Sequence, residues 1–389
     1  MKALLIVLSL LFVTAAPAAT DPVAELQQRI NAGRSNLVFE KDHGYLVSLL
    51  KALKVPVSSQ TLVFSKTSLQ SERISPSTPR AIYFNDDVYV AWVQGAPVIE
   101  IMSVDPSKGA VFYMLGQDKG DRPVFERSTG HECSVCHYVQ EAAPKFVPRL
   151  MLTSVIPDST GDVAGTFPIE TTDRSPMKER WGGWYVTGTH GSQTHAGNIA
   201  GARPASVPAA LSAAALAGAS NIKDLTRRFN TAPYLSPYSD IVALMTLGHQ
   251  TTVQNLIALA NSRGAGAARE TGESLVRAML FEGAPPLTSP ISGTSTFATD
   301  FQNEGPKDGR GRSLRDFDLQ TRLFRYPLSY LIYSKPFDAL DPAVKTVVYR
   351  RLREILSGAD KSRDFAYLSA TDRAAILEIL RATKPDFPH

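Results

Sequence analysis

The chain has only two cysteines, and both lie in the segment HECSVCHYVQ, residues 131–140. Two residues separate Cys133 from Cys136, and His137 follows directly. Thiols at this spacing can form a disulfide, bind a metal ion together with histidine, or form thioethers to a haem. A disulfide that closes so short a loop removes little entropy from the unfolded chain. Stability is therefore a poor reason for keeping the pair.

The order C-x-x-C-H fits covalent haem attachment best. The two thiols must reach the two vinyl groups at one edge of the porphyrin, and the adjacent histidine then turns its imidazole under the ring to ligate the iron. A thioredoxin-like pair expects a neighbouring βαβ pattern, which the sequence does not show. A zinc site needs two further ligands at a suitable spacing, and no other cysteine exists, although histidines could serve. We predict one covalent haem c on Cys133 and Cys136, with His137 as the proximal iron ligand. A thioredoxin-like thiol–disulfide pair and a zinc site are the alternatives.

The five residues CSVCH resemble the attachment motif of mono-haem c-type cytochromes. The resemblance covers this motif and an N-terminal export signal, and it implies thioethers to Cys133 and Cys136 and axial ligation by His137. A small cytochrome c domain is helical, whereas strand-like sequence flanks this motif on both sides. We therefore expect a fold other than that domain. The phrases YFNDDVYVAWV and RWGGWYVTGTH are also similar to a group of exported bacterial proteins with no assigned activity.

The second axial position of the iron decides what such a haem does. Methionine or histidine there favours electron transfer, while an open position permits ligand binding and catalysis. His249 shares an apolar helical stripe with Met245 and Val253. His190 and His195 lie in GTHGSQTHAGN, where glycines allow a close approach to a planar cofactor. These three histidines are the distal candidates; the alternatives are a hydrogen-bonded core histidine for His249 and an ordinary surface loop for the other two.

Three further groups are weaker candidates. Met151 and Met177 could ligate the iron. Trp181, Trp184 and Tyr185 could form the walls of a haem pocket, and Arg310 and Arg312 could pair with the haem propionates. Core packing or a solvated loop explains each of them as well.

The elements around the motif predict an α+β fold. Residues 21–53 have a helical pattern, with Asp21 as N-cap and Pro22 in the first turn. Short β-branched and aromatic runs at 61–68, 80–93, 97–104 and 109–115 predict an antiparallel meander, and 149–157 and 165–170 are also strand-like. Helical periodicity returns at 209–229, 239–263, 268–281, 343–358 and 371–380, with an apparent loop at 282–313.

We therefore expect three regions. Residues 1–19 form a signal peptide, with Lys2, an apolar run and small residues at Ala16 and Ala18. Residues 20–205 form a β-rich haem-attachment region, and residues 206–389 form a helical region. The signal predicts a periplasmic or secreted protein with no stable membrane span after cleavage.

Bulk composition sets limits on the partners. The 41 basic and 37 acidic side chains leave a formal charge of +4. This mild excess is spread along the chain, which argues against nucleic-acid binding. The sequence thus predicts an exported c-type cytochrome that transfers electrons to or from a redox partner protein or a small molecule. The alternative is a peroxidase- or oxygenase-like haem enzyme with an open distal position, which the length of 389 residues favours.

Overall fold

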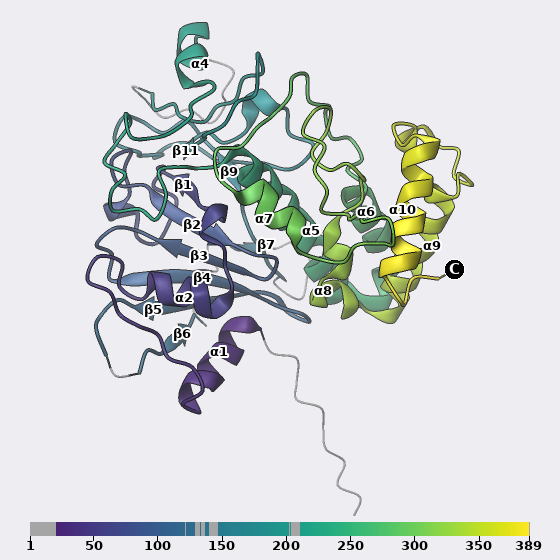
Figure 1. Ribbon diagram of the computed structural model, residues 1–389, viewed down its shortest axis with the longest axis horizontal. Coiled ribbons are helices and arrows are strands. Elements are labelled where there is room, and N and C mark those ends of the chain that lie inside the picture. The colour runs from purple at the N-terminus through teal and green to yellow at the C-terminus, as the bar shows by residue number, and fades with distance from the viewer. Residues whose placement is uncertain are drawn as a thin grey trace, which may run out of the picture.

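The computed structural model describes residues 21–120, 122–128, 133, 137–139, 147–201, 203 and 211–388. Within them the fold is α+β, with an antiparallel sheet in the N-terminal half and most helices in the C-terminal half (Figure 1). The predicted fold class is confirmed. The predicted signal peptide and Cys136 lie outside the described residues.

The main sheet has seven antiparallel strands in the order β11-β1-β2-β3-β4-β5-β6. Their bounds are β1 Thr61–Val63, β2 Arg80–Phe84, β3 Val88–Trp92, β4 Val98–Asp105, β5 Gly109–Gly116, β6 Phe125–Arg127 and β11 Trp184–Tyr185. The meander predicted over residues 61–115 is therefore confirmed. Two further strand pairs are small: β7 Tyr138–Val139 with β8 Val147–Pro148, and β9 Thr153–Ser154 with β10 Ile169–Glu170.

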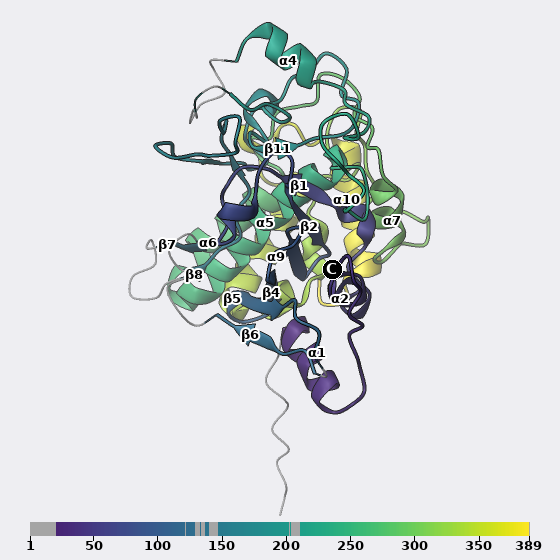
Figure 2. The same cartoon turned by 90° about the vertical axis from the view of Figure 1, so that its left-hand side faces the viewer.

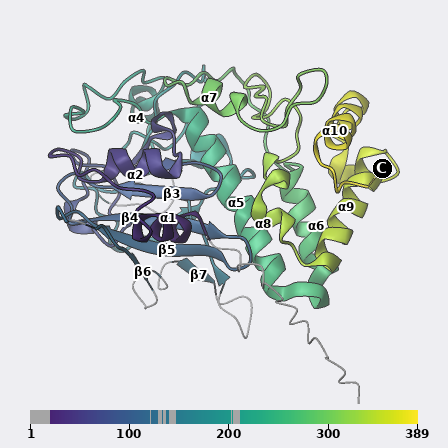
Figure 3. The same ribbon diagram turned by 60° about the horizontal axis from the view of Figure 1, so that its bottom comes forward.

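The two faces of the main sheet have different covers. Because side chains alternate along a strand, Ile82, Ala91, Met102 and Phe112 share one face, which we call the α5 face. The opposite face is packed against the N-terminal helices α1, Pro22–Asn31, and α2, Leu46–Leu53 (Figure 3). Asp21 begins α1 as predicted, since its carboxylate accepts the backbone N–H groups of Val23 and Ala24.

Helix α5, Ile241–Arg263, lies between the α5 face and the C-terminal helices at residues 268–279, 335–338 and 342–356 (Figures 1 and 3). In Figure 2, which is viewed from the side of the sheet, α5 lies behind the strands. Its residues are buried around most of its circumference, so it is a central helix and not one with a single apolar stripe. The other helices are α4 Ala213–Ala219, α6 Ala268–Met279, α7 Phe297–Asn303, α8 Lys335–Asp338, α9 Pro342–Leu356 and α10 Ala370–Thr383.

Some local predictions fail. The helical pattern predicted over residues 21–53 is interrupted between α1 and α2, since residues 32–45 form turns and irregular backbone. Within the described part of the segment 209–229, residues 211–229, the chain is helical only over α4, because Ser220 is extended and Asn221 has a left-handed φ of 53°. The apparent loop 282–313 contains the short helix α7, whose Phe297 and Phe301 pack into the core.

One hydrophobic cluster spans the β-rich and helical regions, and a second lies between the other face of the sheet and helices α1 and α2. The first cluster includes Phe84, Val104 and Phe112 from the sheet and residues from α5, α6, α9 and α10. The contact with α5 is close at Gly109, where an added Cβ would lie 2.7 Å from Cβ of Ala258. Among the described residues, the predicted regions 20–205 and 206–389 therefore differ in secondary structure but are joined by a shared hydrophobic cluster. None of the described helices combines the length and apolar character needed to cross a bilayer.

Candidate functional site

The β7–β8 pair fixes the position of His137. Tyr138 pairs with Pro148 and Val139 with Val147, so Arg149 comes to lie beside His137. The backbone N–H of Arg149 donates to the carbonyl of His137 at 2.7 Å, and Nδ1 of His137 is 2.9 Å from the carbonyl oxygen of Arg149.

This contact sets the tautomer of the imidazole. A carbonyl oxygen can only accept, so Nδ1 carries the hydrogen and Nε2 keeps its lone pair. Nε2 has no hydrogen-bond partner among the described residues. Metal-ligating histidines commonly have this arrangement: one ring nitrogen donates to a backbone carbonyl, and the lone pair of the other nitrogen is available to the metal.

Helix α5 holds the segment that carries Arg149. The side-chain oxygen of Asn255 accepts the backbone N–H of Leu150 at 2.8 Å, and its amide nitrogen donates to the carbonyl of Leu150 at 2.8 Å. The two-point contact connects α5 through Leu150 and Arg149 to His137. Asn255 is therefore a positioning residue that sequence periodicity did not reveal.

The α5 face lies beneath the imidazole. The ring of His137 is 5.0 Å from that of Phe112, centroid to centroid, at an interplanar angle of 45°. Met102 is directly opposite Phe112 on β4, and Met114 is two residues further along β5 on the same face. Both methionines are half-buried, and Cys133 is half-buried against the same core cluster. The imidazole of His137, the ring of Phe112 and the two methionines thus share one part of the sheet.

Sequence reasoning overlooked Met102 and Met114 as sulfur donors because only methionines after the motif were considered. The alternation in VIEIMSVD and GAVFYML was the available signal, since it places both on the face of Phe112.

Polar groups border this part of the sheet. Nη1 of Arg80 is 3.1 Å from Oε2 of Glu100, whose Oε1 accepts from Ser68 at 2.7 Å and from Gln70 at 3.0 Å. Arg149 in turn pairs with Glu170 at 3.1 Å.

Several buried polar atoms here lack partners. Of the nine such atoms found in the described part of the chain, four belong to residues in this region: Nε of Arg80, Nε of Arg149, Oε1 of Gln70 and Oγ of Ser128. Gln70 bonds to Glu100, and the backbone of Ser128 bonds to that of Phe112. Buried polar groups are rarely left unpaired, so their concentration beside His137 fits a site for a polar or charged group that the protein chain does not supply.

Electrostatics keep His137 neutral. Burial is the main factor that lowers the pKa of its imidazole below the ordinary value, and the charges of Arg80 and Arg149 lower it further. The hydrogen bond to the carbonyl of Arg149 and the charge of Glu100 act in the opposite direction. The net direction favours the neutral imidazole, which is the form that ligates a metal.

His249 lies elsewhere, fully buried in a hydrogen-bonded group with Asp173 and Ser329. Its Nδ1 is 2.7 Å from Oδ2 of Asp173, its Nε2 is 2.8 Å from Oγ of Ser329, and Phe281 stacks on its ring at 4.1 Å. Both ring nitrogens are therefore engaged by protein atoms. This is the hydrogen-bonded core histidine that the sequence left open as an alternative to a distal ligand.

The same three side chains have the connectivity of a Ser-His-Asp triad. His249 and Ser329 are both 0% exposed, however, so no substrate reaches the serine in this structure. The backbone N–H of Ser329 donates to the carbonyl of Met279, and its Oγ also accepts the N–H of Leu331 at 3.4 Å. The group thus joins α5 to the segments around Asp173 and Ser329 and serves packing.

His190 and His195 lie beside each other, with ring centroids 4.8 Å apart, and both are buried. Their segment follows β11 and bonds back to it, since the N–H of Asn198 donates to the carbonyl of Trp184. Strand β11 is at one edge of the sheet, five strand intervals from β5. At about 4.8 Å per interval, strands β11 and β5 are about 24 Å apart. The structure therefore does not bring these histidines to His137, which lies over β5.

Hydrogen bonding also limits what the pair can bind. Nε2 of His190 accepts the backbone N–H of Asn221 at 3.0 Å, and Nδ1 of His195 accepts that of Gly197 at 3.1 Å. In a neutral ring the other nitrogen then carries the hydrogen. The buried nitrogens without partners, Nδ1 of His190 and Nε2 of His195, are therefore N–H donors without a lone pair for a metal.

The weaker candidates have structural roles. The three aromatic residues 181, 184 and 185 are buried, and Trp184 donates to the carbonyl of Thr153 at 2.8 Å. Arg310 and Arg312 both pair with Glu378 on α10. Met177 packs against the core, and Met151 is half-buried.

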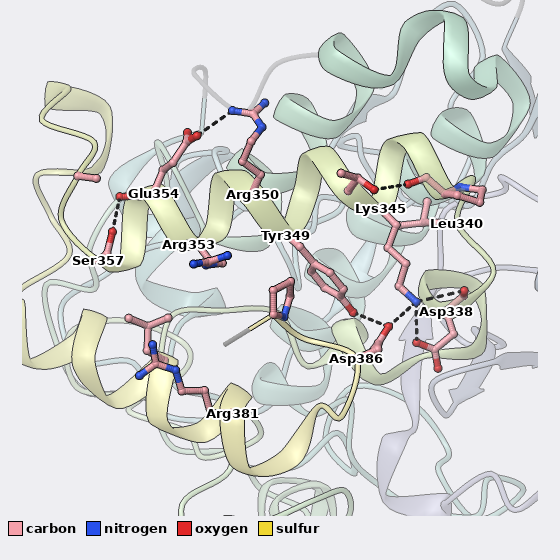
Figure 4. Close-up of a pocket in the computed structure, with 15 residues that line it drawn as sticks. Asp338, Leu340, Lys345, Tyr349, Arg350, Arg353, Glu354, Ser357, Arg381 and Asp386 are labelled. Carbon is pink, nitrogen blue, oxygen red and sulfur yellow. Dashed lines mark hydrogen bonds and ion pairs between the residues drawn. The ribbon is translucent and has the colours of Figure 1, made fainter.

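A separate groove of about 810 Å³ lies between α9, α10 and the C-terminal segment (Figure 4). Lys345 pairs with Asp338 and Asp386, the hydroxyl of Tyr349 donates to Asp386, and Arg350 pairs with Glu354. Most of its charges are thus neutralised within the groove. The groove contains none of the residues predicted from the sequence to attach haem or to ligate its iron.

The described residues hold no cluster of three or more histidine, cysteine, aspartate or glutamate side chains arranged to bind a metal ion. Comparison with known proteins gives no match to any family model, curated protein or solved structure.

Proposed function

We propose that this chain is an exported c-type cytochrome. Cys133 and Cys136 attach one haem by thioethers, and His137 ligates its iron through Nε2. The observation that carries the proposal is the hydrogen bond from Nδ1 of His137 to the carbonyl of Arg149, because it leaves the lone pair of Nε2 available. The motif C-x-x-C-H and the half-buried Cys133 beside the same core support it.

When bound, the haem supplies one-electron transfer between ferric and ferrous iron. The chain's own residues hold and shield it. Asn255, Leu150 and Arg149 fix the imidazole, and Phe112 packs against one side of its ring. The partial exposure of Cys133 and His137 leaves an edge of the site near solvent, where a redox partner or a small electron carrier can approach.

The sixth ligand distinguishes a carrier from an enzyme. The sulfur donors on the α5 face, Met102 and Met114, favour the carrier, because a thioether raises the potential and closes the iron to other ligands. An open position would instead support the peroxidase- or oxygenase-like alternative.

The test is expression of the full chain in a host that exports proteins and matures c-type haem. The purified protein should carry one haem by mass, give a pyridine haemochrome spectrum typical of thioether-linked haem, and respond little to carbon monoxide. Cys133→Ala, Cys136→Ala and His137→Ala should each lose attachment or change the iron spectrum. His43→Ala is the matched control, since that half-buried histidine bonds only to the carbonyl of Pro233 and to nearby Glu40.

Three outcomes separate the alternatives. A protein at apoprotein mass without a Soret band contradicts haem attachment, and a reducible disulfide in it would favour the thiol–disulfide alternative. A high-spin ferric spectrum that changes with peroxide, cyanide or carbon monoxide favours the haem enzyme. A low-spin spectrum insensitive to these ligands favours the carrier.

A further inference from the structure

Two arginines beside His137 have a buried guanidinium nitrogen without a partner. Arg80 uses Nη1 to bind Glu100 at 3.1 Å, and Arg149 uses Nη1 to bind Glu170 at 3.1 Å. The Nε atom of each is buried and makes no hydrogen bond. An unpaired buried donor on one arginine has many explanations, but two on arginines whose charges both act on the same imidazole favour an acceptor at this place that the protein chain does not supply.

The acceptor is not supplied by the neighbouring carboxylate on the sheet. Glu100 already accepts from Arg80, Ser68 and Gln70, so both its oxygens are engaged. The side chain of Arg80 is 15% exposed, which leaves little room for bulk water to satisfy Nε. Arg80 and Arg149 both lie near enough to His137 for their charges to act on its imidazole.

The chemistry of the missing acceptor follows from the proposed function, on which this inference rests. A haem has two propionate carboxylates, which leave the porphyrin from the edge opposite the thioethers. Guanidinium groups are the preferred partners of carboxylates, because Nε and an Nη can form two parallel hydrogen bonds. We infer that Arg80 and Arg149 bind the propionates of the haem held by Cys133, Cys136 and His137.

The test uses holoprotein and removes each arginine together with its carboxylate partner, as Arg80→Leu/Glu100→Gln and Arg149→Leu/Glu170→Gln. The paired changes leave no buried carboxylate uncompensated and do not alter the net charge. The matched control is Arg350→Leu/Glu354→Gln, because this ion pair on α9 lies away from His137 and its removal also leaves the net charge unchanged. The measurement is the midpoint potential of the haem as a function of pH, by spectroelectrochemistry.

Both double variants should show a lower midpoint potential than the wild type, because a propionate without its counter-charge stabilises ferric iron. Their potential should also gain a pH dependence where the wild-type curve is flat, since the released propionate titrates. The control should match the wild type. If a double variant does not fold, Arg80→Lys or Arg149→Lys should give a smaller shift of the same sign, because lysine keeps the charge and loses the fork.

Potentials and pH curves that match the wild type in all arginine variants overturn this inference while leaving the proposed function intact. An equal shift in Arg350→Leu/Glu354→Gln also overturns it, since the potential would then respond to the loss of any arginine–glutamate pair. Absence of haem from the wild-type protein is a different result, and it contradicts the proposed function itself.

Discussion

Replacing Ser329 by alanine tests whether His249 serves packing or turns to the iron. Oγ of Ser329 is 2.8 Å from Nε2 of His249, and both residues are 0% exposed. Because Asp173 engages Nδ1, the hydrogen lies on Nδ1 and Nε2 accepts from the serine. Ser329→Ala therefore leaves a buried acceptor unpaired.

The expected cost is about 1–3 kcal/mol of the free energy of unfolding, the usual penalty for one unsatisfied buried polar group. Unfolding entropy is about 2.1 cal/mol/K per residue, so Tm should fall by about 1–4 °C for a chain of this size. The assay is thermal unfolding followed by circular dichroism. Ser274→Ala on the exposed side of α6 is the control, and its Tm should not change measurably.

The second arm is the iron spectrum of His249→Gln, which should equal that of the wild-type holoprotein. The reasoning is refuted if Ser329→Ala leaves Tm unchanged while His249→Gln alters the iron spectrum, because His249 would then have left its protein partners for the haem. Covalent labelling of wild-type Ser329 by a fluorophosphonate probe would contradict the packing role from another direction, since it requires an accessible nucleophile.

Three further predictions concern the site and the core. Asn255→Ala removes both hydrogen bonds to Leu150 and should cost about 1–3 kcal/mol in denaturant unfolding; a holoprotein with unchanged stability and iron spectrum would show that Asn255 does not position His137. If a methionine thioether is the sixth iron ligand, one of the variants Met102→Leu and Met114→Leu should convert a low-spin iron spectrum to one that responds to carbon monoxide. If neither variant responds, neither methionine is the sixth ligand. Burial raises the pKa of Asp87 to about 6 from 3.8, so the folded state binds its proton more tightly and loses stability as pH rises between these values. Asp87→Asn should therefore stabilise the protein above pH 6 by at most about 3 kcal/mol and have no effect below about pH 4, and a gain confined to acid pH would reverse the sign of the argument.

Features with local causes could be predicted from the sequence. Alternating side chains specify the meander from β1 to β5, and Asp21 with Pro22 specifies the start of α1, because these patterns act over a few residues. Failures occurred where a local pattern competed with distant contacts. The helical composition of 209–229 did not prevent the break at Asn221, whose side chain bonds to the backbone of His190 and Gly191.

The sequence by itself determined the chemistry expected at Cys133, Cys136 and His137, because thioether attachment and the adjacent ligand need only five consecutive residues. Only the tertiary structure decided what surrounds His137. Phe112, Arg80 and Glu100 come to His137 through strand pairing and the packing of β8 on α5. His249 finds its partners 76 and 80 residues away in the chain. A histidine on an apolar helix looks the same in sequence whether its nitrogens meet iron or protein, since that choice is made by contacts that form when the chain packs.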